Sequence, residues 1–227
     1  MKNPYLEEYL TALGDNLDIN ENPLSLGLYA ASRLSQGKVI DQSAVADKHY
    51  SQLDGLYKLC YERDRCVKKY AWAIPNQEAI EELVKLSPII ELGAGRGYWA
   101  SLVQAAGGDI VAYDSWINED GDIRHFSSDS YEKTFMRVDK GDASAVVELH
   151  ADRTLFLCWP PYHNNMASVT LKKYMEHGGK TLVYVGEDAG GCTADKEFFD
   201  LLADIEPRYI NIPTWPGIHD YMAIYSL

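Results

Sequence analysis

The sequence predicts an α/β protein built on an open, mostly parallel β-sheet, and three observations carry that prediction. From Pro75 onward, short apolar runs alternate with helical patterns, which is typical of βαβ units. Gly93, Gly95 and Gly97 follow the first of these runs at every second position, where a strand that turns sharply into a helix needs glycine. With 227 residues, the chain is long enough for one such domain and a small addition.

The N-terminal third lacks strand alternation. Its apolar spacing predicts helices at about 5–13, 24–34 and 43–70. We therefore divide the chain into a helical N-terminal extension, residues 1–70, and an α/β domain, residues 71–227.

The domain elements follow in order along the chain. Expected helices cover 76–86, the residues after Gly97, 166–177, and 193–202 with Thr193 as N-cap. Expected strands cover 89–92, 110–113, a short segment around 136–138, 154–158, 180–185, 209–213 and 221–227. The last two strands are joined by a loop short enough for an antiparallel return.

The residue before the glycine loop indicates which ligand it holds. Glu91 ends the strand, and a carboxylate there repels the pyrophosphate of a dinucleotide but attracts a cation. The dinucleotide pattern G-x-G-x-x-G starting at Gly93 also requires a small residue at position 98, which is Tyr98. The loop therefore favours S-adenosylmethionine, which carries an ammonium and a sulfonium. A nicotinamide dinucleotide, or a glycine turn without a ligand, remains an alternative.

Two further acids follow expected strands. Asp114 lies 114 − 97 = 17 residues past Gly97, where an acid can accept hydrogen bonds from both ribose hydroxyls. Asp142 follows the short third strand, where an adenine amino group needs an acceptor. The three acids are expected to face three parts of one cofactor.

With these motifs in this order, residues 70–227 resemble the class I, Rossmann-like S-adenosylmethionine-dependent methyltransferases. The resemblance implies a seven-stranded, mostly parallel sheet with helices on both faces and a closing antiparallel strand pair. It also implies that Trp72 and Pro75 close over the methionine end of the cofactor; the alternative for Trp72 is that it seals the helical region onto the sheet. The predicted cofactor-binding residues are Trp72, Pro75, Glu91, Gly93, Ala94, Gly95, Gly97, Asp114, Ser115, Asp142, Ala143 and Trp159.

The run Cys158-Trp-Pro-Pro-Tyr162 resembles the Asp/Asn-Pro-Pro-Tyr/Phe motif of methyltransferases that act on amino nitrogens. In that family the acid or amide accepts a hydrogen bond from the target amino group, and the aromatic residue stacks on the substrate. Trp159 stands at the accepting position and offers only an N–H donor, so transfer to nitrogen by that mechanism is in doubt. Tyr162 can still stack or hydrogen-bond. The alternative is a proline-rich turn that caps a strand.

Two loops are expected at the same rim of the sheet, 186–193 and 215–220. Glu187 and His219 are candidate proton acceptors, because both residue types act as general bases when positioned. The alternatives are a carboxylate at a strand end for Glu187 and an ordinary turn histidine for His219. Tyr162, Glu187 and His219 are thus the predicted catalytic residues.

Composition narrows the class of acceptor. The net charge is −13, from 34 acidic and 21 basic residues, and nucleic-acid affinity rests on basic contacts to phosphates. A DNA or RNA substrate is therefore disfavoured. The four cysteines form no C-x-x-C pair, so no metal is expected, and no signal or membrane segment is found.

The sequence therefore predicts a cytoplasmic methyltransferase that acts on a small-molecule or protein acceptor. Its oligomeric state is open. A non-catalytic module that binds the cofactor or a partner protein, and an NAD(P)-dependent oxidoreductase, are the alternatives.

Overall fold

The computed structural model describes residues 2–16, 58–124 and 130–227. It divides into two compact units. One comprises Tyr70–Leu227 together with Lys2 and Asn3, and the other covers Pro4–Lys69. No helix among the described residues has the length and apolar character needed to cross a bilayer.

Two helical segments of the smaller unit are described: α1 (Pro4–Asn16) and residues 58–69. Glu8 on α1 forms ion pairs with Lys69 at 2.6 Å and with Arg65 at 2.8 Å. Electrostatic pairing therefore joins the two ends of this unit. The helix expected at 24–34 lies outside the described residues, and the one expected at 43–70 is described only from residue 58 onward.

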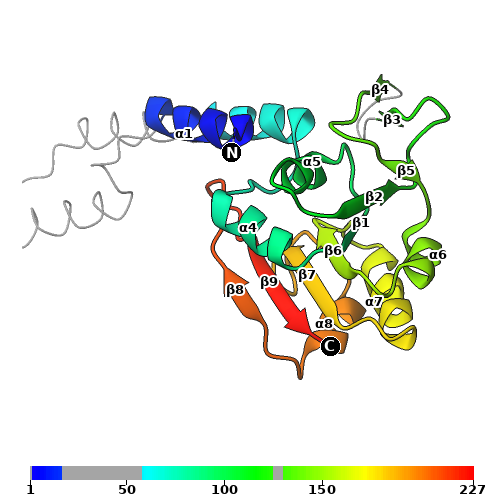
Figure 1. Ribbon diagram of the computed structural model, residues 1–227. Coiled ribbons are helices and arrows are strands. Elements are labelled where there is room, and N and C mark those ends of the chain that lie inside the picture. Colours follow the sequence, from blue (N-terminus) through cyan, green and yellow to red (C-terminus); the bar gives the residue numbers. More distant parts are fainter. Residues whose placement is uncertain (1, 17–57, 125–129) are drawn as a thin grey trace, which may run out of the picture. The chain divides into compact units, whose positions relative to one another are not determined.

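The larger unit contains the predicted sheet, which has seven strands in the order β5-β2-β1-β6-β7-β9-β8 (Figure 1). All neighbouring pairs are parallel except the two that involve β9, which is reversed against β7 and β8. The strands are β1 (Ile89–Leu92), β2 (Ile110–Asp114), β5 (Asp139–Lys140), β6 (Thr154–Cys158), β7 (Thr181–Gly186), β8 (Arg208–Ile210) and β9 (Tyr221–Ser226). The predicted Rossmann-like sheet is confirmed.

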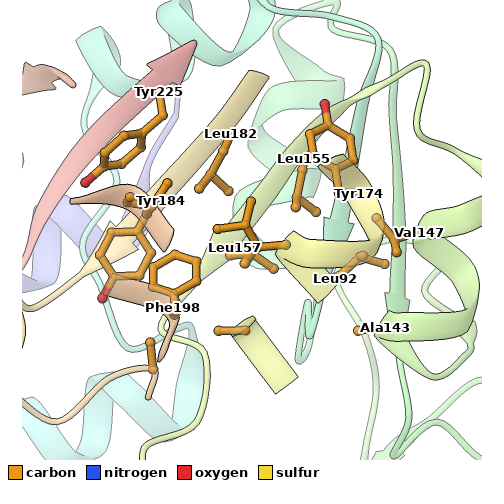
Figure 2. Packing of buried hydrophobic residues seen from close by; sticks show 14 of the residues in the cluster. Leu92, Ala143, Val147, Leu155, Leu157, Tyr174, Leu182, Tyr184, Phe198 and Tyr225 are labelled. Atoms are coloured by element: carbon orange, nitrogen blue, oxygen red, sulfur yellow. The ribbon is translucent and has the colours of Figure 1, made fainter. Parts of the chain in front are cut away.

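Helices cover both faces of the sheet (Figure 1). They are α4 (Gln77–Lys85), α5 (Tyr98–Ala105), α6 (Ala143–Val146), α7 (Met166–Glu176) and α8 (Lys196–Leu202), with a 3₁₀ turn at Val147–Leu149. On one face, alternate strand residues such as Leu92, Leu157 and Tyr184 pack against Tyr174 of α7 and Phe198 of α8 (Figure 2). On the other face, Trp99 of α5 packs against Phe156 of β6, with ring centroids 5.7 Å apart and the ring planes tilted by 59°. Residues that alternate along each strand therefore serve two separate apolar layers.

Local sequence explains where α4 begins. The Asn76 side chain accepts a hydrogen bond from Ala79 N at 2.9 Å, which caps the helix. Ala79, Ile80 and Leu83 then form its buried face, and Lys85 lies in the last turn, where a cation is favoured. Capping and amphipathic spacing together specify this helix.

Two expected elements differ in the structure, and one element was not expected. The third strand is β5 at Asp139–Lys140, not 136–138, and a separate ribbon of β3 (Ile123–Arg124) and β4 (Tyr131–Glu132), absent from the sequence prediction, precedes it. The prediction of Thr193 as an N-cap is wrong. Helix α8 starts at Lys196 after Asp195. The buried Thr193 hydroxyl instead bonds to the Tyr184 hydroxyl at 2.6 Å, because burial requires it to find a polar partner.

Candidate active site

The topology places one switch point at the centre of the sheet. From β1 the chain winds outward through β2 and β5, and then returns to β6 on the other side of β1. Ligands of open α/β sheets bind beyond the carboxyl ends of strands at such a point. The two loops there are the glycine loop after β1 and the loop that begins at Trp159 after β6.

The glycine loop has the backbone conformation that its sequence predicts. Gly93, Gly95 and Gly97 have φ values of 71°, 56° and 69°, in the region that favours glycine. The N–H groups of Gly93 and Ala94 donate to Tyr113 O at 3.0 and 3.1 Å, which ties the loop to β2. A Cβ on Gly97 would lie 2.8 Å from Val138, whereas one on Gly95 would meet nothing within 4 Å. Of the three loop glycines, only Gly95 therefore faces open space. A residue whose backbone is approached by a ligand must face open space.

Glu91 lies beneath this loop with 2% of its surface exposed. Its Oε2 atom is buried and has no hydrogen-bond partner. Burial raises the pKa of Glu91 to about 8, opposed by a hydrogen bond from the Ala100 backbone and assisted by the nearby Asp114. A buried carboxyl with an unused oxygen fits a cationic ligand group and disfavours a phosphate.

Asp114 ends β2 and organises the glycine loop directly. Its Oδ2 accepts a hydrogen bond from Gly95 N and its Oδ1 one from Trp116 N, both at 2.9 Å. Burial raises the pKa of Asp114, although these two backbone donors oppose the shift. Each carboxylate oxygen can accept a second bond, so Asp114 retains the capacity predicted for a diol. The neighbouring Ser115 is exposed.

Asp142 is the N-cap of α6. Its Oδ1 accepts bonds from Ser144 N at 3.0 Å, Ser144 Oγ at 2.6 Å and Ala145 N at 3.3 Å. The Ser144 hydroxyl is the main reason that the pKa of Asp142 lies below its ordinary value. Ala143 is buried in the core cluster. Asp142 therefore has a local structural role whether or not it also meets an adenine.

We expect Asp142→Ala to lower the free energy of unfolding by about 1 kcal/mol, because three local hydrogen bonds at a helix start are lost. Urea denaturation at pH 7 measures this change. Asp142→Asn keeps an acceptor oxygen and should recover most of it. Equal stability of all three proteins would contradict the capping role.

The segment before α4 is fixed from two sides. Trp99 Nε1 donates to Ala73 O at 3.2 Å, and Asn3 Nδ2 donates to Pro75 O at 2.6 Å. Pro75 is buried, while Trp72 is 38% exposed. Of the two residues predicted to contact the cofactor here, only Trp72 therefore presents substantial surface.

Trp159 lies against Trp72. The rings are stacked, with centroids 5.4 Å apart and an angle of 14° between their planes. Trp159 has a φ of 51°, an outlier for a bulky side chain, and its N–H donates to Val185 O at 2.7 Å. Its indole Nε1 donates to Asp220 Oδ2 at 3.1 Å. Trp159, which has no acceptor atom in its side chain, thus contacts the carboxylate of Asp220 from another loop.

Tyr162, the aromatic residue of the same loop, is 47% exposed. Its ring lies 3.7 Å from that of His163, centroid to centroid. The loop is tied to the 186–195 loop by Ala194 N, which donates to Pro160 O at 3.0 Å. The Tyr162 side chain is therefore accessible at the surface, and its predicted contact with an acceptor stays a prediction.

Glu187 joins the two rim loops. Its Oε2 accepts from Cys192 N at 2.8 Å and its Oε1 from His219 N at 3.1 Å. Burial alone would raise the pKa of Glu187, but the two backbone donors, together with the charge of His219 and the Cys192 side chain, lower the pKa below its ordinary value. A carboxylate so stabilised is a weak base, so the geometry favours a structural role for Glu187. The His219 side chain is exposed.

Glu187→Gln should lower the free energy of unfolding at pH 7 by roughly 1–2 kcal/mol, because one charge-assisted acceptor becomes an amide donor. Since the folded-state pKa is depressed, this contribution is present above the unfolded pKa and is lost as pH falls through the folded value. Denaturant titrations at pH 7 and pH 3.5 measure both effects. A difference that persists undiminished at pH 3.5 would argue against the ionised bridge.

Comparison with solved structures finds similar chains at low sequence identity. The methyltransferase domain of bacterial CtHen1-CN is 15% identical, with 67% of this chain and 99% of that chain covered and a TM-score of 0.45. Magnesium protoporphyrin IX methyltransferase (ChlM) of Synechocystis PCC 6803 with bound SAM is 14% identical over 83% and 97%, with a TM-score of 0.40. Human N-acetylserotonin methyltransferase in complex with SAM is 12% identical over 96% and 66%, with a TM-score of 0.40. No family model and no curated protein sequence matches the chain.

The seven strands, their mostly parallel pairing and the closing antiparallel pairs are those that the sequence resemblance implies. The chain has a Rossmann-like α/β fold with a seven-stranded sheet in which one strand is reversed. Among the described residues, no group of three or more His, Cys, Asp or Glu side chains could hold a metal ion.

Two contributors to this candidate site were not predicted from the sequence. Arg96 joins the β3–β4 ribbon to the glycine loop: its Nε donates to Lys133 O at 3.0 Å and its guanidinium lies 4.7 Å from the centre of the Phe135 ring. Asp220 lies at the carboxyl edge because β9 is antiparallel to β7, with Tyr221 paired to Gly186. The position of Asp220 directly before an apolar strand could have indicated that it lies at this edge. Its contact with Trp159 could not be predicted in this way, because the two residues are 61 positions apart in the sequence.

Proposed function

We propose that the protein is an S-adenosylmethionine-dependent methyltransferase that acts on a small-molecule or protein acceptor. The observation that carries the proposal is the presence of two features in the same loop region. Glu91 provides a buried carboxyl oxygen without a hydrogen-bond partner, and Gly95 provides a backbone position open to a ligand. S-adenosylmethionine needs an acidic partner for its positive charge and a backbone position that it can approach closely. A glycine turn that binds no ligand needs neither.

In this proposal Glu91 holds the ammonium of the methionine end, Asp114 the ribose hydroxyls and Asp142 the adenine amino group. In the loop of Gly93, Ala94, Gly95 and Gly97, the backbone of Gly95 gives access, while Trp72, Pro75, Ser115, Ala143 and Trp159 border the cofactor. When bound, the cofactor supplies an activated methyl group on a positively charged leaving group. The protein contributes mainly placement, which alone can supply much of such a rate enhancement.

The acceptor side is assigned to Tyr162, His219 and the aromatic pair of Trp72 and Trp159. Tyr162 and His219 are exposed at the rim, where they can stack on an acceptor or take a proton from it. Glu187 is proposed to hold the rim loops in place, because both of its oxygens accept backbone N–H groups.

Calorimetry with S-adenosylmethionine and S-adenosylhomocysteine tests the cofactor assignment. We expect micromolar binding to the wild type and its loss in Asp114→Ala. No binding by a folded wild-type protein would refute the proposal. Transfer of a labelled methyl group to any component of a cell extract then separates an enzyme from a non-catalytic module.

A nicotinamide oxidoreductase is the second candidate from the sequence. It requires two phosphates beside the carboxyl of Glu91, whose pKa is raised by burial. Once this carboxyl ionises, its negative charge repels the phosphates. Titration with reduced nicotinamide cofactors, followed by fluorescence, tests it directly. Saturable binding there, with none for S-adenosylmethionine, would reverse the assignment.

A further inference from the structure

The acceptor side of the carboxyl edge combines an aromatic stack with a buried acid. Asp220 is 6% exposed and receives the indole N–H of Trp159 at 3.1 Å. Trp159 in turn stacks on Trp72, which keeps 38% of its surface exposed. Trp159 therefore contacts both the flat apolar ring of Trp72 and the carboxylate of Asp220.

The backbone shows that this arrangement is specified. Trp159 adopts a φ of 51°, which glycine or asparagine would tolerate more easily than tryptophan. Strain of this kind persists only where the surroundings impose it, and it concentrates at functional positions. In this conformation Trp159 contacts both Trp72 and Asp220.

The charge of the surrounding loops is of one sign. Segments 70–76, 158–165, 186–195 and 213–220 contain no lysine or arginine. The same segments contain four carboxylates: Glu187, Asp188, Asp195 and Asp220. Their field selects against anionic acceptors and favours groups with positive charge or N–H donors.

The field also reaches beneath the edge. Burial raises the pKa of the partly buried Cys158 thiol well above its ordinary value, and the charges of Glu91 and Asp220 raise it further. Glu91 and Asp220 therefore both act on this thiol, from the β1 and β9 sides of the sheet. With Glu91 proposed for the cofactor, Asp220 is the buried acid on the acceptor side.

We infer that Trp72, Trp159 and Asp220 form the acceptor subsite and that it binds an amine nitrogen carried on a flat aromatic or apolar scaffold. Trp72 contacts the scaffold, Asp220 accepts a hydrogen bond from the nitrogen, and Trp159 is a positioning residue that holds Asp220. Tryptophan faces attract cations, and a carboxylate forms charge-assisted bonds with an ammonium. The inference rests on the proposed function, since it names the acceptor class of that site.

The test uses three probes of matched shape: phenethylammonium, 2-phenylethanol and phenylacetate. Each is titrated by calorimetry at pH 7 into the full chain saturated with S-adenosylhomocysteine. We expect the ammonium to bind about tenfold more tightly than the alcohol, and the carboxylate most weakly. Asp220→Asn should remove the preference for the ammonium, while the affinity for S-adenosylhomocysteine stays unchanged.

Two further variants keep the test decisive. Trp159→Phe retains the ring but not the N–H donor, so it should reduce the preference even if Asp220→Asn does not fold. Asp188→Asn removes an exposed acid of the same edge and should leave the preference intact. Equal binding of the three probes, or no binding of phenethylammonium, would overturn the inference. Failure of S-adenosylhomocysteine alone to bind would instead overturn the proposed function, because the probe titrations can be run without it.

Discussion

Replacing Gly95 by alanine should weaken S-adenosylmethionine binding roughly tenfold to a hundredfold while the protein remains folded. The new methyl group would meet no protein atom within 4 Å, so it creates no internal clash. It would instead occupy the space that a ligand must enter to approach the loop. The φ of 56° adds about 1–2 kcal/mol of strain, which should appear as a moderate loss of stability.

Gly97→Ala should behave differently, although it lies two residues away. Its methyl group would lie 2.8 Å from Val138 Cγ2 and 3.3 Å from Met136 Cγ, in addition to a φ of 69°. Strain and overpacking together should cost about 2–5 kcal/mol of folding free energy. Urea denaturation should therefore separate the two variants in stability, and calorimetry should separate them in binding.

Gly107→Ala provides the matched control. Gly107 also has a positive φ, 92°, and an added Cβ there would likewise meet nothing within 4 Å, but it is exposed after α5 and away from the switch point. It should lose a similar amount of stability to Gly95→Ala and bind the cofactor as the wild type does. If Gly95→Ala also binds as the wild type does, the loop does not contact the ligand.

The sheet could be predicted because its signals are local. The runs at 89–92 and 154–158 are apolar, bounded by turns, and become β1 and β6 with the expected limits. Glycine spacing likewise specified three positive φ values. The short β5 and the β3–β4 ribbon were placed incorrectly or missed because two-residue strands bury too little apolar surface to leave a periodic pattern.

The site could be predicted only where one residue acts alone. Glu91 and Gly95 have their expected surroundings because strand position and backbone conformation follow from neighbouring residues. The partnership of Trp159 with Asp220 spans 61 residues and two strands, so no local pattern reveals it. Glu187 has the residue type of a general base, but one of the two backbone donors that lower its pKa, His219 N, comes from another loop.

The second large effect concerns Glu91 and pH. In the unfolded chain this carboxyl has the ordinary pKa of 4.5, whereas burial in the folded protein raises it to about 8. Between these values the folded protein holds a proton that the unfolded chain has released. The stability that Glu91 contributes is therefore complete below pH 4.5 and is lost as pH rises through about 8.

We expect the wild type to lose about 2–3 kcal/mol more stability between pH 6 and pH 9 than Glu91→Gln, whose amide does not ionise. Urea denaturation at pH 6, 7.5 and 9 gives both slopes. Glu119→Gln, which changes an exposed carboxyl, should retain the wild-type slope. Parallel slopes for wild type and Glu91→Gln would mean that Glu91 is already ionised in the folded protein.

Cofactor binding should report on the same proton. An ammonium near the unused Oε2 atom stabilises the ionised carboxylate, so binding below pH 8 must release the proton from Glu91. The binding enthalpy at pH 7 should then differ between phosphate and Tris buffers, whose ionisation enthalpies differ, and this difference should shrink in Glu91→Gln. Affinity of the wild type should rise up to about tenfold per pH unit below pH 8, because less work is needed to ionise the carboxyl. Buffer-independent heats with intact binding would show that the ammonium contacts another group, which leaves the cofactor assignment standing but removes Glu91 from it.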